Sequence, residues 1–141
     1  MEIQTFLLAQ TIEKVERGIS TNYNAANIGL HNFYAKDGKY PIEFNFPYYM
    51  LLKRVICENE EVITLRFNLV DIDGRKTGKP NDVCAEGRFP KGHKFMTVSG
   101  KIKFLFPRPG DYRLDITADE NKFEGIYSYN IEIGKKEDTI Y

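Results

Sequence analysis

The sequence of 141 residues has no tryptophan and few soft metal ligands. Cys57, Cys84, His31 and His93 are its only cysteines and histidines, and none of them has the paired spacing of a zinc site. A chain of this length buries about 70% of the surface that its unfolded form exposes, so its fold does not require a metal or a disulfide. We therefore expect neither a metal site nor a cofactor.

Long hydrophobic runs are also missing. No segment approaches the ~20 apolar residues of a membrane-spanning helix. Residues 1–18, MEIQTFLLAQTIEKVERG, have a short apolar run, carry Glu2 and lack a small-residue cleavage site, unlike a signal peptide. We expect a cytoplasmic protein without membrane contact, in which both cysteines are reduced; in a secreted protein the two could form one disulfide.

Motifs of catalysis and nucleotide binding are absent. The sequence has no glycine-rich phosphate loop and no dinucleotide fingerprint, and none of its serines lies in a nucleophile elbow. Cys84 has Arg88 and His93 nearby in the sequence, which would suit a reactive thiol, but an inert thiol is the simpler interpretation. We therefore expect that the protein is not an enzyme.

The chain has no net charge, because 20 basic residues balance 20 acidic ones. This balance argues against a general attraction to nucleic acid or membranes. Residues 75–103 nevertheless contain eight basic residues and only two acidic ones, Asp82 and Glu86. The excess fits either charged strand edges that prevent aggregation, or a site for an anionic small molecule or an acidic partner. The candidate anion site consists of Arg88, Lys91, His93, Lys94, Lys101 and Lys103.

Alternation of apolar and polar residues is the dominant pattern. In residues 61–74, EVITLRFNLVDIDG, the side chains of Ile63, Leu65 and Phe67 fall on one face of a strand, and three later stretches alternate in the same way. Turn signals such as KDGK, DIDGR and PRPGD separate these stretches. The pattern predicts an all-β protein: a single β-sandwich of seven to eight mainly antiparallel strands, immunoglobulin-like or C2-like in general architecture. The sandwich would span residues 1–134 and precede a polar tail at residues 135–141.

Some segments are ambiguous. Residues 3–10 and 47–57 are apolar on both faces and fit either a central strand or a short helix. Residues 11–18, TIEKVERG, could add a helical turn that ends at Gly18. The Asn-rich residues 20–38 are interpreted as a loop followed by a strand. Pro47 cannot donate a ladder hydrogen bond, so it predicts a sheet edge or a bulge.

Two turn motifs have structural interpretations. Tyr112 follows the turn PRPG at the start of a late strand, as in a tyrosine corner, where the phenol bonds back to the upstream backbone. Gly110 would permit a positive φ in that turn. Asp71 and Asp73 lie in DIDG, which we interpret as a hairpin turn because the further acidic residues of a calcium loop are missing.

Four of these segments together resemble a known family. They are LLA at residues 7–9, FPYYMLLKRVI, LVDIDGR at residues 69–75 and FPRPGDYRLDI. In this order they resemble short uncharacterised bacterial β-sandwich proteins that are classed only as a domain of unknown function. The resemblance covers residues 1–133, departs from the family pattern in STNYNAANIGLHNFYA and in the basic middle segment, and implies a compact sandwich without assigned catalytic residues.

Aromatic residues gather in FNFPYYM, residues 44–50. Most of them are expected in the core, but any left at an edge would suit a protein interface, and Phe46, Tyr48 and Tyr49 are the candidates. The predicted function is therefore a non-enzymatic binding or assembly module that engages a partner protein or a second copy of itself. The alternative is an anion-binding module that captures a nucleotide-like ligand, or less readily a nucleic acid, through residues 75–103.

Overall fold

The computed structural model describes residues 1–18, 20–28, 38–123 and 125–134. Within them the chain forms eight strands and one 3-10 helix. They are β1 (Glu2–Arg17), β2 (Ser20–Ile28), β3 (Ile42–Lys53), β4 (Glu61–Asp71), β5 (Val83–Phe89), β6 (Phe95–Phe106), β7 (Gly110–Ala118), the 3-10 helix η1 (Asp119–Asn121) and β8 (Tyr127–Ile133). The predicted tail at residues 135–141 and His31 lie outside the described residues. No helix in the described part of the chain is long and apolar enough to cross a membrane.

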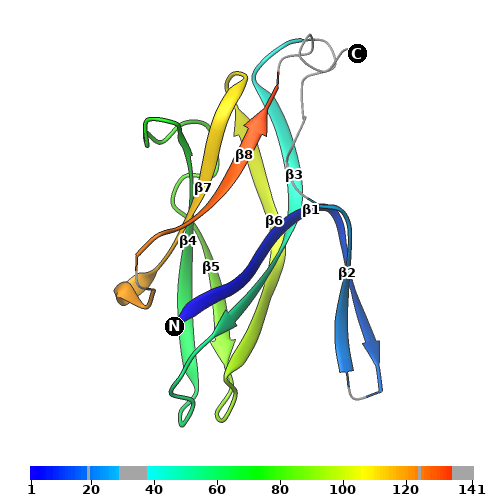
Figure 1. Cartoon of the computed structure of the whole chain (residues 1–141), viewed down its shortest axis with the longest axis vertical. Coiled ribbons are helices and arrows are strands. Elements are labelled where there is room, and N and C mark those ends of the chain that lie inside the picture. Colours follow the sequence, from blue (N-terminus) through cyan, green and yellow to red (C-terminus); the bar gives the residue numbers. More distant parts are fainter. Residues whose placement is uncertain (19, 29–37, 124, 135–141) are drawn as a thin grey trace.

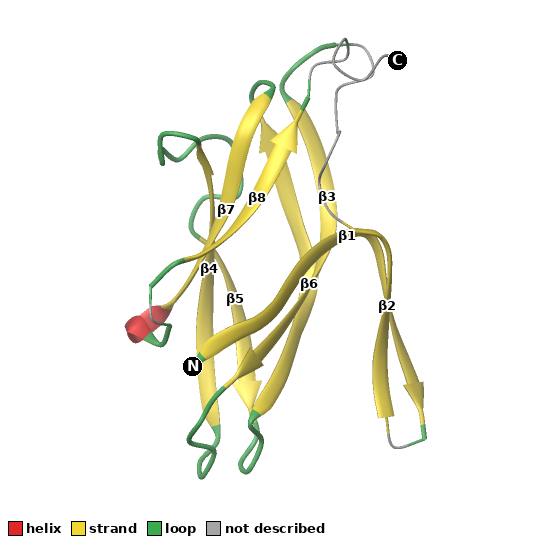
Figure 2. Cartoon of the chain, in the orientation of Figure 1, coloured by secondary structure: helices red, strands yellow, loops and turns green. Residues whose placement is uncertain are grey.

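The strands form two antiparallel sheets that pack face to face (Figures 1 and 2). The first sheet has the order β2-β1-β3-β6 and the second has the order β5-β4-β7-β8. Every pairing between named strands is antiparallel. The predicted all-β sandwich is therefore confirmed.

The core lies between the two sheets and follows the alternation of the sequence. In β4 the side chains of Ile63, Leu65 and Phe67 are buried, while the residues between them are only partly covered. Because neighbouring residues of a strand point to opposite faces, each strand contributes every second side chain to the core. Burial of one such leucine or phenylalanine stabilises the fold by about 1.5–3 kcal/mol.

The N-terminal half of the chain differs from the prediction in two places. The helical turn predicted for residues 11–18 is wrong, because β1 continues as one strand to Arg17. The loop predicted from residue 20 is also wrong at its start, because residues 20–28 form β2, which pairs with β1 from Arg17↔Ser20 to Ala9↔Ile28. Gly18, with φ +58, lies in the turn of this hairpin, where a positive φ is required, and does not end a helix. The remainder of that predicted segment, residues 29–37, lies outside the described residues.

The strand β1 changes its partner half-way. Its pairing with β3 ends at Leu8↔Tyr48, and its pairing with β2 begins at Ala9. Pro47 lies directly beyond the last β1–β3 pair, where β3 loses β1 as a neighbour. Among the described strands, β3 therefore has a partner only on its β6 side at Pro47, which agrees with the sheet edge, one of the two alternatives predicted there.

The tyrosine corner is confirmed as well. The buried Tyr112 hydroxyl donates a hydrogen bond of 2.6 Å to the Arg108 carbonyl oxygen and accepts one of 3.3 Å from the Arg108 N–H. Burial raises the pKa of Tyr112. Gly110 adopts a φ of +145, which its missing side chain permits. The PRPG segment is thus a structural support for the turn between β6 and β7.

Candidate functional site

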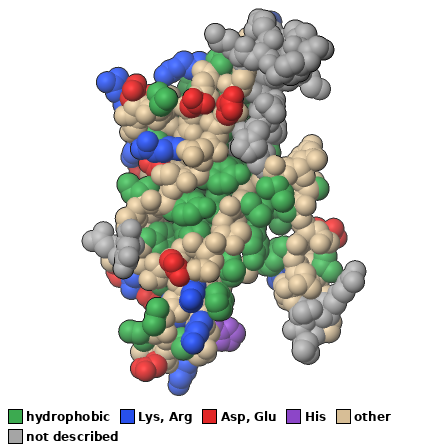
Figure 3. All heavy atoms as spheres, in the orientation of Figure 1, with side chains coloured by type: hydrophobic (Ala, Val, Ile, Leu, Met, Phe, Trp, Pro, Cys, Tyr) green, Lys and Arg blue, Asp and Glu red, His purple; other side chains and the backbone are tan. Residues whose placement is uncertain are grey.

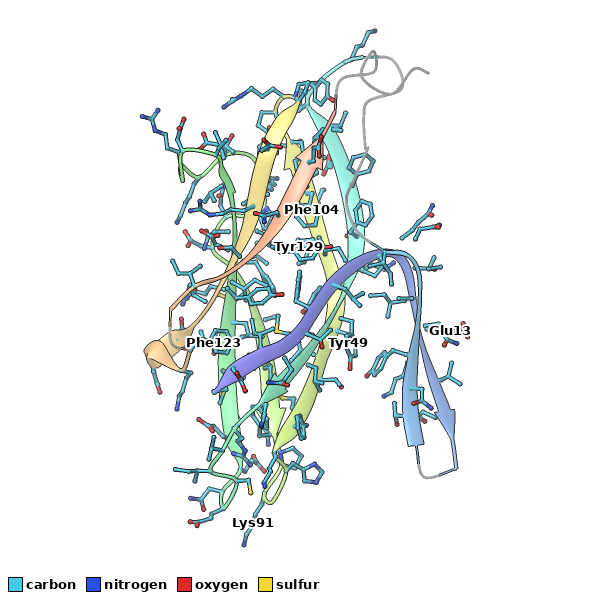
Figure 4. The ribbon with its side chains drawn as sticks, viewed as in Figure 1. Glu13, Tyr49, Lys91, Phe104, Phe123 and Tyr129 are labelled. Carbon is cyan, nitrogen blue, oxygen red and sulfur yellow. The ribbon has the colours of Figure 1, made fainter. Side chains whose placement is uncertain are left out.

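The six residues of the predicted anion site do not come together. Lys91, His93 and Lys94 lie in the loop between β5 and β6, at one end of the sandwich (Figure 4). Lys101 and Lys103 lie on β6, seven and nine positions after Lys94. A strand rises about 3.3 Å per residue, so roughly 23 Å separates the backbone of Lys94 from that of Lys101. One small anion cannot contact both groups.

Two members of the predicted anion site are already paired with acidic side chains. Arg88 Nη1 lies 2.6 Å from Glu60 Oε1, and Lys103 Nζ lies 2.6 Å from Glu43 Oε1. These four side chains are largely exposed, so each pair contributes little stability. They fit the interpretation of charged strand edges better than that of an anion site.

The basic loop is held in place by a residue that the sequence reasoning missed. Arg54 is 4% exposed, and its guanidinium donates hydrogen bonds of 2.9 Å to the carbonyl oxygens of Pro90 and His93. Its backbone N–H donates to the Lys94 carbonyl at 2.8 Å, and its guanidinium lies 4.7 Å from the centre of the Phe89 ring. The sequence offered one signal, a single arginine within the apolar segment LLKRVIC.

The predicted interface residues lie mostly inside the protein. Phe46 and Tyr48 are 5% and 4% exposed, because the even-numbered positions of β3 face the core, so they offer no contact surface. Burial raises the pKa of Tyr48. Tyr49 points to the opposite face and is half-buried; its ring centre lies 4.8 Å from that of Tyr23 in β2. Burial, and secondarily Tyr23, raises the pKa of Tyr49.

The hairpin that covers Tyr49 is the most distinctive feature of the surface. We call residues 9–28 the hairpin arm; it comprises the second half of β1 and all of β2. The arm is the part of the first sheet that bends away from β3 and β6 and projects from the sandwich (Figure 1), with Tyr49 pointing toward it and Glu13 pointing away (Figure 4). Besides the ring contact with Tyr49, Tyr23 shares a hydrogen bond of 3.2 Å with the Thr97 hydroxyl of β6. Tyr23 thus anchors the arm to the body.

Two hollows lie between the arm and the rest of the first sheet. The first has a volume of about 240 Å³ and the second of about 200 Å³. Both are lined by Ile12 and Tyr23 of the arm. The first hollow has a mixed lining, and its other residues are Leu7, Ala25 and Tyr49 on the apolar side and Thr21 and Asn22 on the polar side. The second hollow is lined by two lysines, Lys14 and Lys101, and by Ser99. Figure 3 shows the lower part of the arm standing apart from the body, with apolar side chains gathered in the centre of this face.

The strand β2 forms the outer edge of the arm. None of the other strands in the described residues pairs with the side of β2 that faces away from β1. Its sequence, STNYNAANI, contains no charged residue and no proline. The other edge strands β5, β6 and β8 carry charges, for example Glu86, Lys101 and Glu132. Charged residues and prolines are the usual protection of an edge against strand addition, and β2 has neither.

A larger hollow, of about 450 Å³, lies elsewhere. It is lined by the start of β1, by Val55 after β3 and by Phe123, Ile126 and Tyr127 around the β7–β8 connection. Its charged lining residues, Glu2 and Lys53, have opposite signs. Since charges of opposite sign line this cavity, it presents no field of one sign, and its size alone does not make it the leading site.

Metal and thiol chemistry find little support in the geometry. Over the described ranges, no three histidine, cysteine, aspartate or glutamate side chains gather closely enough to hold a metal ion. Asp71 Oδ1 accepts the backbone N–H groups of Asp73 and Arg75 at 2.9 and 3.0 Å, and Gly74 has a φ of +80, which confirms the predicted turn. Cys84 is an exposed free thiol whose sulfur lies 3.7 Å from the Asp82 carbonyl oxygen.

Comparison with known proteins does not assign the chain to a family. No protein-family model matches the chain, and no curated protein matches it. Among solved structures, the chain is similar to a family 123 glycoside hydrolase from Clostridium perfringens, whose structure was analysed for details of glycolipid glycan hydrolysis. The two share 16% sequence identity, with a TM-score of 0.36. The similarity covers 76% of this chain but only 23% of the hydrolase. A likeness this distant carries no argument about function.

Proposed function

We propose that the protein is a non-enzymatic assembly module that associates with a second copy of itself through the outer edge of β2. The observation that carries the proposal is the unprotected edge. A nine-residue strand without charge or proline lies at the outside of an arm that projects from the sandwich. An exposed edge of this kind is a template for pairing with another strand.

The geometry of the hairpin indicates which backbone groups would pair. Arg17 and Ser20 flank the two-residue turn of the hairpin, and such a flanking pair exchanges both of its backbone hydrogen bonds. From this pair onward, hydrogen-bonded pairs alternate with non-hydrogen-bonded pairs along the two strands. The backbone N–H and C=O groups of Thr21, Tyr23 and Ala25 therefore point away from β1. Each copy offers three donors and three acceptors along its outer edge.

Symmetry favours a second copy over a different protein. Two β2 edges can meet antiparallel about a twofold axis, which joins two arms into one four-stranded sheet in the order β1-β2-β2-β1. No charged side chain of β2 would face its own copy across that axis, so like-charge repulsion does not oppose the contact. The interface would be small, and we therefore expect a weak, concentration-dependent dimer.

The test is light scattering coupled to size-exclusion chromatography, from micromolar to millimolar protein. The wild type is expected to shift from monomer to dimer. Asn24→Lys adds a charge at the edge and should shift the equilibrium toward monomer, whereas the matched variant Thr11→Lys, on the inner strand of the arm, should dimerise nearly as the wild type does. Thr21→Pro removes an outward N–H and should also give monomer.

Three outcomes would contradict the proposal. If the wild type stays monomeric over the whole range of protein concentration, self-association is excluded. If β2 binds a different protein, that protein and not a second copy is the partner. Equal dimerisation of Asn24→Lys and the wild type would move the interface to another surface.

A further inference from the structure

We propose that the hollow between Lys14 and Lys101 binds a small organic anion. It would hold a carboxylate or phosphate group whose apolar or aromatic body packs against Tyr23 and into the neighbouring hollow. This site lies beneath the arm and uses neither the outer edge of β2 nor a second copy, so it stands independently of the proposed function.

The charges at this hollow come from two distant parts of the chain. Lys14 belongs to the arm and Lys101 to β6, and both line the same space of about 200 Å³ together with the Ser99 residue. Among the described side chains Lys101 is in no ion pair, whereas Lys103, two positions along the same face, pairs with Glu43 at 2.6 Å.

Lys14 has an acidic neighbour of its own. Its ammonium lies 3.2 Å from Glu16, but both side chains are more than half exposed, so that pair is weak. Two lysines that line one hollow attract an anion more strongly than the same charges on a flat surface, because the protein walls focus the field.

The aromatic wall is already in place. The Tyr23 ring is fixed by its contact with Tyr49, at 4.8 Å between ring centres, and by the hydrogen bond of 3.2 Å to Thr97. A ligand would therefore meet a wall that needs no ordering, which lowers the entropic cost of binding. The adjoining hollow of about 240 Å³ would accept the ring on the side lined by Leu7, Ala25 and Tyr49, and Thr21 and Asn22 form its polar side.

The dimensions and walls select the class of ligand. Each hollow is smaller than the roughly 300–1,000 Å³ of sites for drug-sized compounds, which points to a compound with a single ring. Side chains of the arm, of β1, of β3 and of β6 line the two hollows. The volume of each hollow holds one ring and not several residues of an extended peptide, so a small molecule fits better.

The experiment is a titration at low salt, followed by two-dimensional NMR of the labelled full chain. The probes are phenyl phosphate and phenylacetate, with benzyl alcohol as the neutral analogue and inorganic phosphate as the anion without a ring. We expect saturable shifts at Lys14, Tyr23 and Ser99 with at least one ring-bearing anion. The two partial analogues are expected to bind more weakly by about tenfold, since each lacks one of the two sets of contacts.

The matched variants are Lys101→Gln and Lys103→Gln. Both residues are exposed on the same face of β6, so neither change disturbs the core, and each removes one positive charge. Lys101→Gln should raise the dissociation constant about tenfold, as expected for the loss of one charge-assisted contact, and Lys103→Gln less than twofold. Any of three results would overturn the proposal. The two variants could have equal effects, benzyl alcohol or inorganic phosphate could bind as tightly as the ring-bearing anions, or neither ring-bearing anion could give a saturable shift.

Discussion

Removal of one hydroxyl group tests whether the tyrosine corner supports the turn between β6 and β7. In Tyr112→Phe the ring keeps its place beside Phe106, whose ring centre lies 5.2 Å away, so no cavity forms. The Arg108 carbonyl oxygen loses a buried donor at 2.6 Å. A lost hydrogen bond of this kind costs about 1.5 kcal/mol. With an unfolding entropy of about 2.1 cal/mol/K per residue, that loss lowers the Tm by roughly 5 °C for a chain of 141 residues.

Urea unfolding and a thermal melt measure this loss independently. The urea midpoint should fall without a change in its slope, because the surface exposed on unfolding stays the same. The control is Tyr23→Phe, which removes an exposed hydroxyl bonded to Thr97 and should change the free energy of unfolding by less than about 0.5 kcal/mol. If Tyr112→Phe melts at the wild-type temperature, the hydrogen bond does not stabilise the turn and the reasoning fails.

Three further predictions concern the rest of the fold. Arg54→Met should cost about 3 kcal/mol or more in urea unfolding, because the carbonyl groups of the β5–β6 loop lose their buried donor; a loss below about 1 kcal/mol would show that the loop does not depend on it. The hydrogen bond from Lys122, together with Arg54, lowers the pKa of Glu61 from its usual value of 4.5. The stability that this carboxylate contributes is therefore fully present above pH 4.5, and it is lost as the pH falls through the lowered pKa of the folded state. Stability measured against pH should therefore fall less steeply on the acid side in Glu61→Gln, and an unchanged slope would contradict the role of this carboxylate. Added calcium or a chelator should leave the Tm unchanged, since Asp71 already accepts two backbone N–H groups, and a shift of many degrees would reveal a calcium site.

Several features were predictable because their physical causes are local. The inward face of β4, with Ile63, Leu65 and Phe67, follows from the two-residue period of a strand. The turn at Asp71 follows from an aspartate and a glycine at the right spacing, and the corner at Tyr112 follows from the turn residues before it. In each case the residues that decide the outcome are neighbours in the sequence.

The arm was not predictable from the same kind of signal. Residues 11–18 have too few apolar positions to favour a strand over a helical turn, and only pairing with β2 decides between them. The roles of the aromatic residues in β3 also depend on tertiary structure, because the sequence shows that Phe46 and Tyr49 lie on opposite faces but not which face is covered by the second sheet.

The amino-acid sequence by itself determined the class of fold, the strands with one polar face and the structural turns, since backbone preference and side-chain alternation act over a few residues. The tertiary structure decided where the charges lie. It separated Lys94, in the loop before β6, from Lys101 on that strand, because an extended strand places successive residues about 3.3 Å further apart. It placed Lys14 and Lys101 at one hollow although they are far apart in the sequence, because the arm bends away from β3 and brings one of its faces toward β6. The candidate site therefore depends on the point at which β1 ends its pairing with β3 and continues into the arm. No short stretch of the sequence determines that point.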